Sequence, residues 1–76
     1  MEINLKLTAL VAEAIKRDPS GRVTLADGSL LRDLITKLNI PDRYTKLIFV
    51  NGMQVGLDSP LGENDTVVFL PYISGG

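Results

Sequence analysis

The sequence has 76 residues and a mass of 8.3 kDa, so we expect one small domain that buries about 60% of the surface its unfolded chain exposes. Hydrophobic residues make up 45% and charged residues 22%, a globular composition that argues against intrinsic disorder. The formal net charge of -1 lacks the concentrated positive charge that nucleic-acid or anionic-membrane binding requires, so we expect neither partner.

Alternating apolar and polar residues predict a half-buried strand over residues 2–8. A short helix is expected next, with an apolar face formed by Leu10, Val11, Ala14 and Ile15. The run Asp18-Pro19-Ser20-Gly21 ends this helix. A second strand over residues 22–26 is then expected to pair with the first as a hairpin.

The main helix follows the turn signal Asp27-Gly28, and Ser29 is well placed as its N-cap. Its apolar stripe is formed by Leu30, Leu31, Leu34, Ile35 and Leu38. The segment Asn39-Ile40-Pro41 ends the helix. We interpret the stripe as the face that packs on a sheet.

A third strand is predicted over residues 46–50, and Asn51-Gly52 supplies the positive φ angles of a type I′ turn into residues 53–55. The last strand is predicted over residues 66–70, after a turn-rich segment. This order of elements predicts an α+β domain in which the main helix crosses one face of the sheet.

Several strings resemble the MoaD/ThiS sulfur-carrier family. Val50-Asn51-Gly52 matches that family's Val-Asn-Gly hairpin, Asn64-Asp65 resembles its Gly-Asp pair, and residues 69–76 resemble its aromatic, proline and double-glycine ending. Asparagine at position 64 is a mild departure, because asparagine tolerates the left-handed backbone region better than most residues. The resemblance implies a ubiquitin-like β-grasp fold, with a mixed four- to five-stranded sheet on one main helix over residues 1–71 and a flexible tail over residues 72–76.

The residue types limit the chemistry that the chain can perform. No Cys or His occurs, which excludes disulfides, thiol nucleophiles and Cys/His zinc sites and removes the commonest general base. No carboxylates form a close pair with an orienting partner, so we expect neither an enzyme nor a metal site. The N-terminus lacks a secretory pattern and no apolar run approaches the ~20 residues of a membrane span, so we expect a cytoplasmic protein.

Reactive chemistry is expected at the carboxyl group of Gly76. This group is ionised at neutral pH and resists nucleophilic attack until it is activated, for example as an acyl-adenylate. Glycines at positions 75 and 76 let the backbone thread a narrow, water-excluding channel, and Pro71 stops strand pairing because it has no N–H to donate. We expect a tethered substrate, with a tail formed by Pro71, Tyr72, Ile73, Ser74 and Gly75.

The family resemblance implies the reaction and its partners. A ubiquitin-activating-type enzyme similar to MoeB or ThiF would adenylate Gly76 with ATP, and the carrier itself would bind no cofactor. A sulfur donor such as a cysteine desulfurase or rhodanese would convert the adenylate into a thiocarboxylate. The large subunit of molybdopterin synthase would accept the sulfur. The first helix, which thiamin-pathway carriers tend to lack, favours the molybdopterin branch.

A partner-binding patch is expected on the sheet. If Leu47, Val67 and Phe69 face the core, then Ile48, Val68 and Leu70 point outward and resemble the recognition patch of ubiquitin. All eight basic residues lie in residues 1–46, and residues 47–76 carry three acidic ones, so a basic groove of a partner is expected to steer the tail. Conjugation of Gly76 to a target lysine, a thiamin-pathway role and a noncovalent β-grasp adaptor remain open alternatives.

Overall fold

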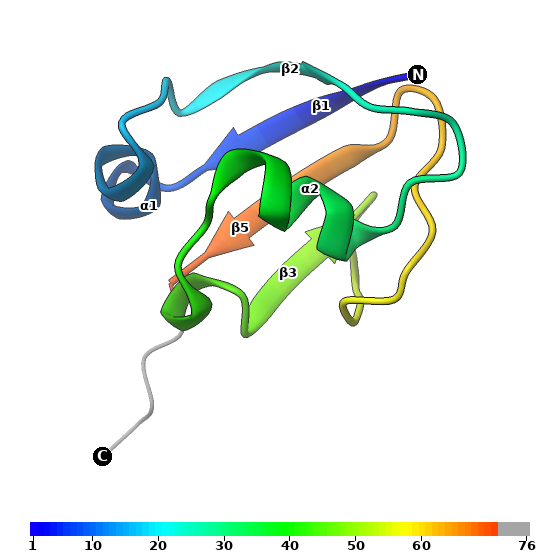
Figure 1. Cartoon of the computed structure of the whole chain (residues 1–76). Helices are drawn as coiled ribbons and strands as arrows, with labels where there is room; N and C mark the ends of the chain where they lie inside the picture. The colour runs from blue at the N-terminus through cyan, green and yellow to red at the C-terminus, as the bar shows by residue number, and fades with distance from the viewer. Residues whose placement is uncertain (72–76) are drawn as a thin grey trace.

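The computed structural model describes residues 1–71, and the tail expected over residues 72–76 lies outside the described residues (Figure 1). Its elements are β1 (Glu2–Leu7), α1 (Ala9–Ile15), β2 (Ser20–Thr24), α2 (Leu31–Leu38), the 3₁₀ turn η1 (Asp42–Tyr44), β3 (Leu47–Val50), β4 (Met53–Gln54) and β5 (Thr66–Leu70). Within residues 1–71 the strands form one five-stranded sheet, and α2 crosses one of its faces. The predicted α+β class is confirmed.

The sheet has the strand order β2-β1-β5-β3-β4, which places β5 at its centre. β5 pairs in parallel with β1 and antiparallel with β3, while β1 also pairs antiparallel with β2 as expected. Val67 and Phe69 of β5 are fully buried beneath α2. The strand that leads to the C-terminal tail is therefore hydrogen-bonded along both edges, and α2 covers one of its faces.

The main helix α2 buries Leu31 and Leu34, as its stripe predicted, but its N-cap differs from the prediction. The N-cap is Leu30, whose backbone N–H donates to Oδ2 of Asp33 at 2.8 Å, while the Ser29 hydroxyl donates backward to the carbonyl of Ala26 at 2.6 Å. Helix starts need acceptors for their free N–H groups, and a carboxylate in the first turn serves this purpose well. Ser29 therefore stabilises the preceding turn instead of the helix.

The first helix also differs from the expected face. Val11 and Ala12 are its buried residues, whereas Leu10 is 55% exposed and Ala14 is exposed. Because α1 starts directly after the Thr8 cap at the end of β1, the exit direction of the chain decides which side meets the sheet. A helix of seven residues is too short for its own apolar stripe to overrule that direction.

Two segments were placed incorrectly or missed by the sequence analysis. The second strand covers Ser20–Thr24, two residues earlier than predicted, because its register pairs Lys6 with Ser20 and ends at Glu2 opposite Thr24. The turn η1 was not predicted. It follows Pro41 and places Tyr44 in the core, where the side chain is 8% exposed.

The left-handed conformations expected at Asn51, Gly52 and Asn64 are confirmed. Asn51 and Gly52 have φ angles of 52° and 85°, as a type I′ turn requires. Asn64 has a φ of 66°, so asparagine occupies the conformation for which a glycine would be the usual choice. Among the helices of residues 1–71, none is both long and apolar enough to cross a lipid bilayer.

Candidate functional site

The described part of the site is the base of the tail and the sheet surface around it. The last pair in the ladder between β3 and β5 is Leu47 opposite Leu70, and the half-buried Pro71 follows immediately. Within residues 1–71, strand pairing thus ends before Pro71, as predicted. The remaining predicted site residues, Tyr72, Ile73, Ser74, Gly75 and Gly76, lie outside the described residues.

Four apolar side chains occupy the sheet face opposite α2, beside the base of the tail. We call this set the outer patch, and it consists of Leu47, Phe49, Val68 and Leu70. The register places Leu47 opposite Leu70 and Phe49 opposite Val68, so each pair lies on the same face. All four are half-buried, and none belongs to the buried core cluster or to the side chains that pack against it. The outward orientation predicted for Val68 and Leu70 is confirmed.

The outward orientation predicted for Ile48 is wrong. Ile48 is 1% exposed and lies opposite the fully buried Phe69, so it faces α2 as a core residue. Leu47, which was expected to face the core, takes an outer position of β3 instead, together with Phe49. Because every residue of β3 is apolar, its pattern contains no period of two, and only the pairing with β5 decides which side chains point outward.

The charge around the outer patch also differs from the sequence-based expectation. Lys6 lies beside Val68 in the parallel ladder, and Lys46 directly precedes Leu47; both are exposed. The acidic Glu63 and Asp65 instead precede β5, at the end of the strand far from Pro71. The outer patch therefore has a basic rim, which matches a partner with acidic groups around an apolar centre.

Asn51 and Asp65, which gave rise to the family resemblance, bond to each other at the other end of β5. The Asn51 amide donates to Oδ1 of Asp65 at 2.9 Å, and its Oδ1 accepts from the backbone N–H of Thr66 at 2.9 Å. Oδ2 of Asp65 accepts from the N–H of Gly62 at 2.8 Å. These side chains fix the turn between β3 and β4 to the loop that precedes β5.

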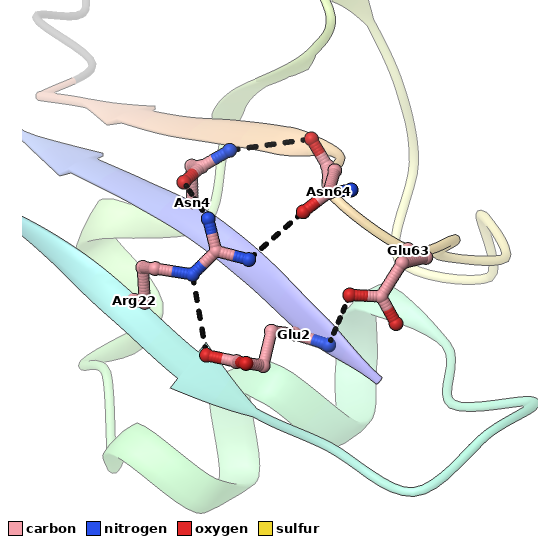
Figure 2. A network of polar contacts seen from close by, with 5 residues as sticks. All are labelled: Glu2, Asn4, Arg22, Glu63 and Asn64. Atoms are coloured by element: carbon pink, nitrogen blue, oxygen red, sulfur yellow. Dashed lines mark hydrogen bonds and ion pairs between the residues drawn. The ribbon is translucent and has the colours of Figure 1, made fainter.

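A second polar cluster joins β2, β1 and the same loop (Figure 2). The Arg22 guanidinium donates to Oε1 of Glu2 at 3.2 Å, to Oδ1 of Asn4 at 3.1 Å and to Oδ1 of Asn64 at 2.8 Å. The Asn4 amide in turn donates to the Asn64 carbonyl at 3.3 Å, and Glu63 accepts from the backbone N–H of Glu2 at 3.2 Å. No role was predicted for Arg22, because its partners come from two separate segments, β1 and the loop before β5.

Comparison with known sequences decides the family. The sequence model of the ThiS family matches residues 5–76, nearly the whole chain. The chain belongs to the ThiS family. No curated protein sequence matches it at a significant level.

Solved structures show that this ThiS-family chain has the ubiquitin-like β-grasp fold. The HVO 2177 protein of Haloferax volcanii matches with a TM-score of 0.83 and 22% identity, over 100% of this chain and 87% of that one. SAMP1 of Haloferax volcanii matches at 0.75 and 20%, over 100% of both chains. A putative molybdopterin converting factor subunit 1 of Pyrococcus furiosus matches at 0.76 and 21%, over 96% and 99%. The chain thus shares the fold of these proteins.

In this ThiS-family chain, replacing Asp65 by alanine should lower the free energy of unfolding by about 1–3 kcal/mol, because the Gly62 N–H and the Asn51 amide both lose their acceptor. Urea denaturation measures the change. Asp58→Ala is the matched control, since Asp58 is 78% exposed and bonds only to Arg32 among residues 1–71; its removal should cost less than about 1 kcal/mol. Equal losses in the two variants would contradict the role given to Asp65.

No cluster of metal-binding side chains occurs in residues 1–71 of the ThiS-family domain. Residues 1–71 contain no group of three or more acidic side chains placed to hold a metal ion. The features that remain for function are the outer patch, its basic rim and the strand that ends at Pro71.

Proposed function

We propose that the chain is a sulfur carrier whose reactive group is the carboxyl group of Gly76. The observation that carries this proposal is the extent of the ThiS-family match, which runs through the domain and includes both Gly75 and Gly76. The domain would serve as a handle and the tail as a substrate, with the catalytic groups supplied by partner enzymes. We further propose that these reactions take place in the cytoplasm, where ATP is available.

Activation would proceed in two steps. A carboxylate oxygen of Gly76 attacks the α-phosphate of ATP in the active site of a ubiquitin-activating-type enzyme, and pyrophosphate leaves. A sulfur nucleophile then attacks the carbonyl carbon and AMP leaves. If the nucleophile is a protein persulfide, made by a cysteine desulfurase or a rhodanese, a thiol cleaves the resulting acyl disulfide and releases the thiocarboxylate.

We propose molybdopterin synthesis as the destination of the sulfur. Two similar structures support this choice: the putative molybdopterin converting factor subunit 1 of Pyrococcus furiosus, and a complex of subunits 1 and 2 of that factor from Helicobacter pylori. The Helicobacter structure matches with a TM-score of 0.65 and 18% identity over 100% of both chains. By analogy, the outer patch would dock on the large subunit while the tail enters its active site.

A second candidate is conjugation to proteins. Structures of small archaeal modifier protein 1 from Haloferax volcanii and Methanosarcina acetivorans match the chain along nearly its whole length, with TM-scores of 0.77 and 0.71. The activation step would be the same, but a lysine amine would replace sulfur as the nucleophile. Thiamin synthesis is an alternative destination for the sulfur, and a noncovalent adaptor would use the outer patch alone.

Mass spectrometry separates these possibilities. The protein ending at Gly76 is incubated with an adenylating enzyme, ATP and a sulfur source, and the expected product carries one sulfur in place of one oxygen at Gly76. Isopeptide-linked adducts on other proteins would instead support a modifier. An unchanged mass with each activating enzyme from the same genome would reject both forms of activation and favour the adaptor.

A further inference from the structure

The outer edge of β2 has backbone groups that bond to nothing within residues 1–71. Among these residues β2 pairs only with β1 and ends the sheet. Met1 and Leu25 exchange both backbone bonds at 2.8 Å, which fixes the alternation along the ladder. By this alternation Gly21 and Val23 bond to β1, while the N–H and C=O groups of Ser20, Arg22 and Thr24 point away from the sheet.

A groove lies on each side of this edge, and Ser20, Gly21 and Arg22 line both grooves. One groove, of about 740 Å³, lies between α1 and β2, with Ala12 and Gly21 in its lining. The other, of about 380 Å³, lies on the outer sheet face and includes Lys6 and Ser20. Gly21 keeps the first groove open, because a Cβ built there meets no atom within 4 Å. An added strand would thus find space for its side chains on both faces.

The charged side chain of β2, which could protect this edge from pairing with another strand, points away from the edge. Edge strands are often protected by a charged side chain, and Arg22 is the charged residue of β2. Figure 2 shows its guanidinium reaching across β1 to Asn64, with Glu2 and Asn4 as further acceptors. The edge therefore remains open, and the bonds of Arg22 hold its backbone in place.

The charges around the grooves favour an acidic occupant on the outer face. Lys6 lies opposite Ser20 in the ladder, is exposed and forms no ion pair with any residue from 1 to 71. A side chain of an added strand opposite Ser20 would pass over that small residue and reach the Lys6 ammonium. On the other face, residues 13–18 contribute two acidic and two basic residues to the lining of the groove, so their charges cancel. The small residues Ala12 and Gly21 leave room there for an apolar side chain.

We propose that the edge of β2 binds an extended segment of a partner protein by strand addition, with acidic side chains toward Lys6 and apolar ones toward Gly21. Backbone bonds would provide affinity, and the two grooves would provide selectivity. A second copy of the chain is a poor occupant, because antiparallel pairing centred on Arg22 places like charges opposite each other. This surface adjoins the outer patch at Lys6, has its own backbone groups on β2 and needs no tail.

The test is an NMR titration of the full chain with an acetylated and amidated peptide in which glutamate alternates with valine. The amide signals of Ser20, Arg22 and Thr24 should shift, and their hydrogen exchange should slow. Lys6→Glu should weaken binding about fivefold or more. The matched control is Lys46→Glu, the same charge change on the other side of the outer patch, and it should change the dissociation constant less than about twofold.

Further variants make the outcome decisive. Gly21→Val should fill the first groove and abolish binding while its thermal transition stays or rises, because glycine weakens a strand and the added side chain has room. A chain without Gly75 and Gly76 should bind the peptide normally, so failure of the carrier function leaves this result unaffected. No binding at millimolar peptide, shifts confined to the outer patch, equal weakening by Lys46→Glu, or β2-mediated dimers would each overturn the proposal.

Discussion

Deletion of Gly76 is expected to abolish activation by the adenylating enzyme while the thermal transition of the protein stays where it is. The deletion draws the terminal carboxyl group back by about 3.5 Å. A displacement of about 1 Å at a reacting centre can cost about 10²-fold in rate, so the loss should be at least that large. The measurements are ATP–pyrophosphate exchange with the cognate enzyme and calorimetry of the isolated protein.

A variant of unchanged length distinguishes the effect of the position of the carboxyl group from the effect of added side-chain volume. Gly76→Ala keeps the carboxyl group at its distance but adds a Cβ, so it should be activated more slowly than the unchanged chain and faster than the deletion. Normal activation of the deletion would reject Gly76 as the reactive residue in both the carrier and the modifier readings. Unfolding of the deletion would instead show that the tail belongs to the domain, contrary to the predicted boundary at residue 71.

The accuracy of the sequence-based predictions depended on how local each feature is. The hairpin at Asn51-Gly52 and the left-handed Asn64 were predicted correctly, because a positive φ depends on the residue itself and its immediate neighbours. The stripe of α2 was also correct, since a period of 3.6 is contained within one helix. Its N-cap was wrong because the N–H groups of Leu31 and Arg32, which a Ser29 cap would bind, donate instead to the carbonyls of Ser59 and Leu57 in a distant loop.

Features created by pairing between distant segments were not predictable in this way. Lys6 lies beside the outer patch only because β1 and β5 pair in parallel. The charge of residues 47–76 alone therefore predicted an acidic surface near the tail, where the folded sheet has a basic one. The three acceptors of Arg22 likewise come together only in the folded sheet. Ile48 was assigned to the wrong face for a related reason: an all-apolar strand can satisfy either face until its register is known.

The corrected face assignment makes a second prediction with a large effect. Ile48→Ala should lower the free energy of unfolding by about 2–5 kcal/mol, because it leaves a cavity beside the fully buried Phe69. For a domain whose total stability is about 5–15 kcal/mol, this loss should be obvious in a urea titration. Leu70→Arg should cost less than about 1.5 kcal/mol, because the half-buried Leu70 lies outside the core and its replacement can extend into solvent.

In their effect on activation by the partner enzyme, the two variants should rank in the opposite order. Leu70→Arg places a charge within the outer patch and should lower kcat/KM for activation about tenfold or more, because an unpaired charge is costly to bury at an interface. Ile48→Ala, assayed at a temperature where it is still folded, should be activated nearly normally. A stable Leu70→Arg that is activated at the normal rate would remove the outer patch from recognition. If Leu70→Arg unfolds while Ile48→Ala stays stable, the inner and outer faces of the sheet have been assigned the wrong way round. The basic rim formed by Lys6 and Lys46 would then not surround the surface that partners contact.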